Sequence, residues 1–162
     1  MPNDQSLSFA GLRAFLASPI FLAAIMSMFT AQFIKAAIAV LRRRTGSLKD
    51  LIETLLWRTG GMPSSHSSLA VSITTSIAFE SGTDSPVFML SFFFALVVIR
   101  DAMGVRRAAG LQAKAFNQFG KEVRERLGVS FHPVKEVHGH TFPQVLVGSM
   151  LGFFIALAFY RL

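Results

Sequence analysis

The residues of this sequence that are best suited to chemistry fall into four short groups, each at or near an end of an apolar segment. The most informative group is Gly60-Gly61-Met62-Pro63-Ser64-Ser65-His66-Ser67. Pro63 suits the first turn of a helix, Ser64 and Ser65 can cap it, and free amides at a helix start bind anions. His66 would lie inside a membrane helix, where a histidine is costly unless it has a role. The alternative interpretation is a capped helix start with a hydrogen-bonded histidine.

The second group runs from Arg100 to Arg107 and contains Asp101, Arg106 and Arg107. Arginine is suited to bidentate recognition of phosphate, and Asp101 is a candidate salt-bridge partner that orients an arginine. Taken singly, these arginines can also be anchors that hold the end of a membrane span in the cytoplasm.

The third group, Lys135 to Gln144, contains His138 and His140. One histidine could be a nucleophile at phosphorus while another histidine acts as a general acid. Two histidines this close could also ligate a metal ion, but the sequence has no cysteine and no H-E-x-x-H pattern. We therefore expect neither a metal ion nor another cofactor.

The fourth group is Lys35 with Gln32, which lies one turn earlier on the same helix face. A lysine within a membrane helix costs about 3 kcal/mol on insertion scales. Its ammonium group could reach the nearby membrane surface along its own aliphatic chain. Gln32 argues instead for a polar pocket inside the membrane.

These groups must be positioned by apolar segments, because hydrophobic residues make up 52% of the chain and its mean hydropathy is +0.50. Four segments stand out, at about 14–41, 63–79, 86–99 and 143–160. Only the first and the last reach the ~20 residues that a helix needs to span a bilayer. The composition predicts an all-α fold: a single domain over 1–162 with about four transmembrane helices and cytoplasmic amphipathic helices at 48–58 and 111–127.

The distribution of charge predicts how the chain is oriented in the membrane. Lysine and arginine gather in the loops at 42–58 and 100–135, whereas the turn at 82–84 contains neither. The positive-inside rule places those loops in the cytoplasm and both termini outside, which indicates a multi-pass protein of the inner (plasma) membrane. The formal charge of +7 then reflects topology and anionic headgroups, and we expect no nucleic acid partner.

Four blocks of the sequence stand in a recognisable order: Gln32-x-x-Lys35, GGMPSSHS at 60–67, DAMGVRRAAGLQA at 101–113 and GHTFPQVLVG at 139–148. Together they resemble the divergent type-2 phosphatidic acid phosphatase family, which is related to acid phosphatases and vanadium-dependent haloperoxidases. The resemblance extends from about Gln32 to Gly152 and implies a membrane-embedded phosphatase.

The resemblance also implies roles for individual residues. His140 matches the nucleophilic histidine and His66 the general acid. Lys35 and either Arg106 or Arg107 match the cations that bind phosphate. Backbone amides near Ser64 and Ser65 complete the phosphate site, with Ser65 where the family usually has glycine.

The sequence departs from the family pattern at three points. No Arg-Pro pair follows Lys35, and a long insertion separates the third-motif arginine from His140. Gln144 replaces the aspartate that orients the nucleophile; it can accept a hydrogen bond from the imidazole but offers no charge. Asp101 or Glu136 could supply the missing carboxylate.

The sequence thus predicts a metal-independent phosphatase that hydrolyses a phosphomonoester through a phosphohistidine, with its active site on the cytoplasmic side. The expected substrate is a phospholipid such as phosphatidylglycerophosphate or phosphatidic acid, or a prenyl phosphate. The alternative is a non-catalytic membrane protein that binds anionic lipid or scaffolds partners. Four thin helices around a polar pocket bury little area, so a homodimer is a plausible assembly.

Overall fold

The computed structural model describes residues 9–41, 61–136 and 139–161. These residues form six helices and no strand, which confirms the predicted all-α fold. The helices are α1 (Phe9–Leu16), α2 (Pro19–Leu41), α4 (Ser65–Ser81), α5 (Pro86–Met103), α6 (Val105–Leu127) and α7 (Phe142–Arg161). Within the described ranges, α2, α5 with its continuation α6, and α7 are long and apolar enough to cross a membrane. The fourth crossing, by the 17-residue α4, stays a prediction.

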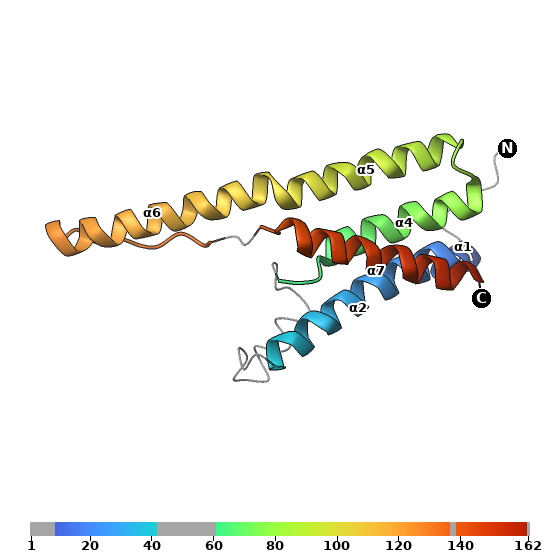
Figure 1. Cartoon of the computed structure of the whole chain (residues 1–162), viewed down its shortest axis with the longest axis horizontal. Coiled ribbons are helices and arrows are strands. Elements are labelled where there is room, and N and C mark those ends of the chain that lie inside the picture. The colour runs from blue at the N-terminus through green and yellow to red at the C-terminus, as the bar shows by residue number, and fades with distance from the viewer. Residues whose placement is uncertain (1–8, 42–60, 137–138, 162) are drawn as a thin grey trace.

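The helix bounds differ from the sequence prediction where turn residues intervene. The first apolar segment is divided, because the chain turns at Ala17 and Ser18 before Pro19 opens α2. The third segment continues past Ile99 to Met103, and α6 follows almost collinearly after a break at Gly104 (Figure 1). The amphipathic helix predicted at 48–58 lies outside the described residues.

The central element of the bundle is α4, which contacts α2, α5 and α7. Its buried side chains are small and polar, Ser67, Ser68 and Ser72 among them. Small residues let helix backbones approach closely in a membrane. On α7, Gly148 faces the backbone of Ser64 and Gly152 faces the backbone of Ser68, so closely that an added Cβ would overlap a carbonyl oxygen.

Hydrogen bonds fasten α4 to two of its neighbours. The Ser68 hydroxyl donates to the carbonyl of Ser27 on α2 at 3.2 Å, and the Thr74 hydroxyl lies 3.0 Å from the carbonyl of Ser91 on α5. Buried polar groups in a membrane are retained when they find such partners. The close α4–α7 packing and these bonds together fix where α4 begins.

We expect Gly152→Val to destabilise the bundle by about 1–3 kcal/mol, because the new side chain would have to displace the Ser68 carbonyl. Thermal unfolding of the purified protein in detergent measures the change. Phe154→Val is the matched control, since Phe154 is exposed on the same helix. Equal unfolding temperatures for the two variants would contradict the packing described here.

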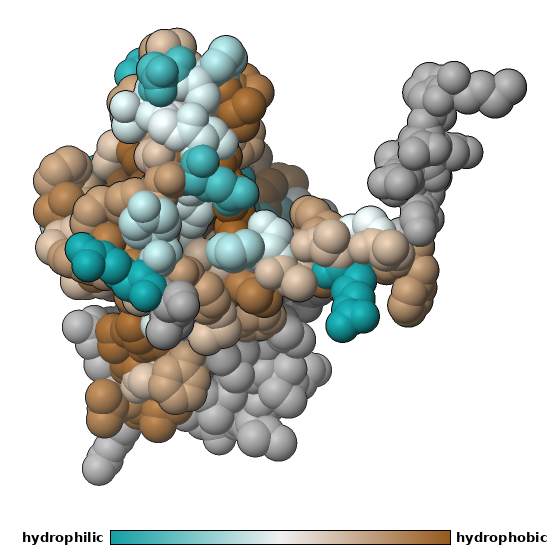
Figure 2. Space-filling view, turned by 90° about the vertical axis from the view of Figure 1, so that its right-hand side faces the viewer, coloured by the Kyte–Doolittle hydropathy of each residue, from teal (hydrophilic) through white to brown (hydrophobic). Residues whose placement is uncertain are grey.

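The helices α4 and α5 are joined by a short capped turn at the end of the bundle where α1 and the end of α7 also lie (Figure 1). Gly82 adopts φ 81°, and the Ser85 hydroxyl caps α5 by accepting from the Phe88 amide at 3.1 Å. Figure 2 views the molecule from this end and shows scattered hydrophilic residues between hydrophobic ones. The four polar groups of the sequence analysis lie toward the other end of the bundle.

Beyond that other end, α6 projects from the bundle, and residues 129–136 return along it (Figure 1). The Asn117 side chain both donates to the Val134 carbonyl, at 2.9 Å, and accepts from its amide, at 2.8 Å. Phe131 packs against Gly120, where a Cβ would collide with its ring. At the base of this arm, Gly139 lies directly against the backbone of Arg107. The long insertion between the arginines and His140 is therefore a folded-back arm, and its two ends meet.

Candidate active site

The polar groups from distant parts of the sequence converge where α4 begins and α5 ends. The His140 amide donates to the Ala102 carbonyl at the end of α5, at 2.9 Å. The Ser64 amide donates to the carbonyl of Gln144 on α7, at 3.0 Å. These two backbone bonds tie the second and third groups of residues to the start of α4.

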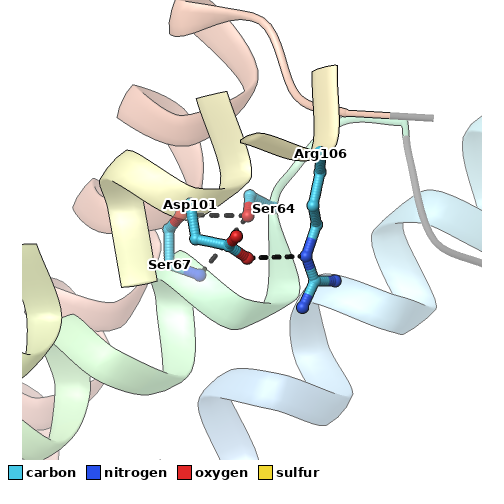
Figure 3. Close-up of polar contacts among 4 residues, drawn as sticks. All are labelled: Ser64, Ser67, Asp101 and Arg106. Atoms are coloured by element: carbon cyan, nitrogen blue, oxygen red, sulfur yellow. Dashed lines mark hydrogen bonds and ion pairs between the residues drawn. The ribbon is translucent and has the colours of Figure 1, made fainter. Parts of the chain in front are cut away.

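Ser64 is the N-cap of α4, and its hydroxyl accepts from the amide and the hydroxyl of Ser67, at 3.3 and 3.0 Å (Figure 3). Both the amide and the hydroxyl of Ser64 are therefore already engaged. The first amides of the helix proper belong to Ser65 and His66, and neither has an acceptor in the described part of the chain. Such amides favour an anion. The structure thus offers the amides of Ser65 and His66 to an anion, while Ser64 shapes the turn.

Lys35 is buried within the bundle and is hydrogen-bonded to Gln32 on its own helix. Only 6% of the residue is exposed, and its Nζ donates to Gln32 Oε1 at 3.0 Å. Its aliphatic chain passes close to Gly61, where a Cβ would lie 3.5 Å from the lysine Cγ. The cation is therefore held beside the loop that leads into α4.

The two candidate arginines are placed differently. Arg106 Nε lies 2.7 Å from Asp101 Oδ2, and Figure 3 shows this pair beside the start of α4. The charge of Arg106 acts on both His66 and His140. Arg107 instead supplies the backbone surface against which Gly139 packs. Asp101 thus has the salt-bridge geometry expected from the sequence, and its partner is Arg106.

His140 is 5% exposed, and its Nδ1 lies 3.3 Å from Gln144 Oε1. The Thr141 amide donates to the same oxygen at 2.9 Å. Because a backbone amide can only donate, this contact identifies the Gln144 atom as the oxygen, which in turn requires a proton on His140 Nδ1. In the neutral imidazole the other ring nitrogen, Nε2, then keeps its lone pair, as a nucleophile must.

Burial lowers the pKa of His140 below its ordinary value of 6.5, and the nearby charges of Lys35, His66 and Arg106 lower it further. The hydrogen bond with Gln144 acts in the opposite direction. The net direction is downward, so the neutral, nucleophilic imidazole persists below the pH at which an exposed histidine would protonate.

Neither candidate for the missing carboxylate contacts the His140 ring. Asp101 is paired with Arg106, and Glu136 accepts from the Asn117 side chain at 3.0 Å. His138 lies outside the described residues. Over the ranges that the structure describes, no group of three histidine or acidic residues could hold a metal ion.

Sequence reasoning missed the glycines that bring these groups together, Gly139, Gly148 and Gly152. A signal for two of them was present, since Gly148 and Gly152 form a G-x-x-x-G pattern in an apolar helix. Gly139 carried no such signal, because its contact with Arg107 depends on the arm between them.

Comparison with known proteins places this arrangement in a family. A family model described as the divergent PAP2 family matches residues 16–155, most of the chain. The chain belongs to the divergent PAP2 family. In Bacillus subtilis (strain 168), the uncharacterized membrane protein YuiD is 34% identical over 147 residues, which cover 84% of this chain and 90% of that protein. No solved structure matches the chain. The residues matched by the family model include all four polar groups of the sequence analysis. The relative in Bacillus subtilis is itself described as a membrane protein.

Proposed function

We propose that this protein is a membrane lipid-phosphate phosphatase that works through a phosphohistidine and needs no metal ion. The observation that carries the proposal is the position of His140, whose ring bonds to Gln144 through Nδ1 and lies within the electrostatic influence of Lys35, His66 and Arg106. Membership of the divergent PAP2 family supports a phosphatase-related activity. A buried histidine among cations suits a dianionic phosphate.

In the first step, His140 Nε2 attacks phosphorus and the bond between phosphorus and the lipid oxygen breaks. His66, in its protonated form, gives its proton to the departing oxygen, which leaves as the lipid alcohol. Lys35, Arg106 and the amides of Ser65 and His66 hold the other phosphoryl oxygens and offset their charge. These groups supply the stabilisation that metal ions supply in other phosphoryl-transfer enzymes.

In the second step, His66 takes a proton from a water molecule whose oxygen attacks the phosphorus of the phosphohistidine. The bond between phosphorus and Nε2 breaks, inorganic phosphate leaves and His140 is neutral again. Gln144 Oε1 holds Nδ1–H throughout, which keeps the ring in one tautomer.

The substrate we propose is a phosphomonoester on an apolar tail, such as phosphatidic acid, phosphatidylglycerophosphate or a prenyl phosphate. The basic loops support, by the positive-inside rule, a site on the cytoplasmic side of the plasma membrane. That side favours a lipid made on the cytoplasmic leaflet, of which phosphatidylglycerophosphate is an example.

The experiment that tests this function measures phosphate release by the purified protein from a panel of lipid phosphates, with and without EDTA. Release that resists EDTA and is inhibited by vanadate, a mimic of the pentacoordinate phosphoryl group, supports the proposal. A second candidate, an anionic-lipid-binding scaffold, is favoured by the absence of a carboxylate bonded to His140 within the described chain. Folded protein that binds lipid phosphate but releases no phosphate and ignores vanadate would establish the scaffold.

Gln144→Glu tests the role of the missing charge. A carboxylate beside Nδ1–H would raise the pKa of His140, so we expect the acid limb of kcat/KM to move to higher pH. The wild-type limb should lie below pH 6.5, because activity falls as pH drops through the lowered pKa of the nucleophile. A full pH profile of both proteins measures the shift. Identical acid limbs would mean that another group controls the acid side.

A further inference from the structure

The central helix α4 has four sides, and three of them are covered. Gly148 and Gly152 of α7 cover the side of Ser64 and Ser68. Thr74 bonds to α5, and the hydroxyl of Ser68 reaches α2. Among the described helices, α7 contacts both α2 and α5, whereas α2 and α5 do not contact each other. The described helices therefore leave the side of α4 opposite α7 uncovered between α2 and α5.

His66, Ile73 and Ile77 occupy this open side. Their spacing of seven and four residues places them on one helix face, and Ser68, which faces α7, lies about 200° around the helix from His66. His66 is exposed, and the two isoleucines are half-buried. An apolar track thus runs from His66 for roughly 16 Å along this side of α4, at 1.5 Å per residue.

We propose that the hydrocarbon chain of the substrate lies along this track, with its phosphate at His66. The inference rests on the proposed function and follows from in-line transfer. His140 Nε2 must approach phosphorus from the side opposite the departing oxygen, and that oxygen carries the lipid. Since His66 protonates the departing oxygen, the chain leaves the site on the side of His66, where Ile73 and Ile77 continue the same face. The track selects long-chain phosphomonoesters over soluble ones.

A second apolar site offers a competing place for the chain. A groove of about 370 Å³ lies between α4, α5 and Phe153 of α7, and Val71 and Ile99 are among its lining residues. Val71 lies about 140° around α4 from His66, so this groove opens on a different side of the helix. The groove also ends at Ile99, one turn before Ala102, whose carbonyl accepts from the His140 amide.

The two places are distinguished by a matched pair of variants in the full-length protein, Ile73→Trp and Val71→Trp, since both side chains are half-buried on α4. We expect Ile73→Trp to lower kcat/KM for a long-chain phosphatidic acid by about tenfold or more while leaving butyl phosphate within about twofold. Val71→Trp should change neither substrate. A selective loss in Val71→Trp, or no selective loss in Ile73→Trp, would overturn the proposal.

A measurement without turnover separates this inference from the proposed function. A phosphatidic acid with a photoreactive group midway along its chain is cross-linked to the His140→Ala variant, and the modified residues are mapped. Cross-links at Ile73 and Ile77 are expected even if no lipid is hydrolysed. Cross-links at Val71 and Phe153 instead would place the chain in the groove and overturn the inference. Absence of phosphate release from wild-type protein would count against the phosphatase alone.

Discussion

His140→Ala is expected to abolish phosphate release from every lipid phosphate that the wild-type protein hydrolyses. Removing the nucleophile removes the covalent step, and losses of roughly 10⁴-fold or more are typical for such residues. The variant should stay folded, because the backbone bond from residue 140 to Ala102 does not need the imidazole. Release of phosphate and the unfolding temperature, measured on the same preparation, test both parts.

His132→Ala is the matched control, since His132 is an exposed histidine on the arm that leads to His140. It should retain full activity. Wild-type protein quenched during turnover should carry phosphate on a histidine, and the His140→Ala variant should carry none. Turnover that persists in His140→Ala would remove this residue from the role of nucleophile.

Arg106→Ala should lower kcat/KM by about 10²–10³-fold, the usual cost of losing one group that stabilises transition-state charge. Arg107→Ala should stay within about threefold of wild type, because alanine keeps the backbone against which Gly139 packs. The comparison is sharp because the two arginines are neighbours in the sequence with the same charge. Kinetics on one lipid phosphate, with the inhibition constant for vanadate, measure both variants.

Arg106→Lys provides the finer control. It keeps the charge but loses the planar donor set that bonds to Asp101 and that we propose for phosphate, so a partial rescue is expected. Equal losses in Arg106→Ala and Arg107→Ala would contradict the separate placements described here. Full activity in Arg106→Ala would mean that Lys35 and the helix amides suffice for phosphate.

Much of this fold could be read from residue types. The apolar runs predict helices at about 14–41, 63–79, 86–99 and 143–160, and the structure has α2, α4, α5 and α7 over these segments. Proline and serine also mark where α4 and α5 begin, because their capping chemistry is local. Features that depend on neighbouring residues, such as helix caps and apolar runs, can therefore be predicted from the sequence.

The contacts that depend on the return of the chain were not visible. Sequence alone left Arg106 and Arg107 equivalent, because it shows neither the ion pair of Arg106 with Asp101 nor the contact of Gly139 with Arg107, which depends on the return of the arm. It also left Asp101 and Glu136 as equal candidates for a carboxylate near His140, but the structure pairs them with Arg106 and Asn117. Such choices are decided by tertiary geometry that no spacing rule encodes.

The length of α4 has a consequence for how the protein meets its membrane. Its 17 residues rise about 26 Å, which is less than the ~30 Å thickness of a typical hydrocarbon layer, whereas the 20 residues of α7 rise about 30 Å. With α4 crossing the membrane as predicted and the Gly82 turn at one surface, the start of α4 would lie a few ångströms below the other surface. The bilayer would then have to thin there, or a lipid would have to sink below the plane of its neighbours to reach Ser65 and His66. Hydrophobic mismatch would then help to admit the substrate, and the thickness of the bilayer would set the rate of substrate entry.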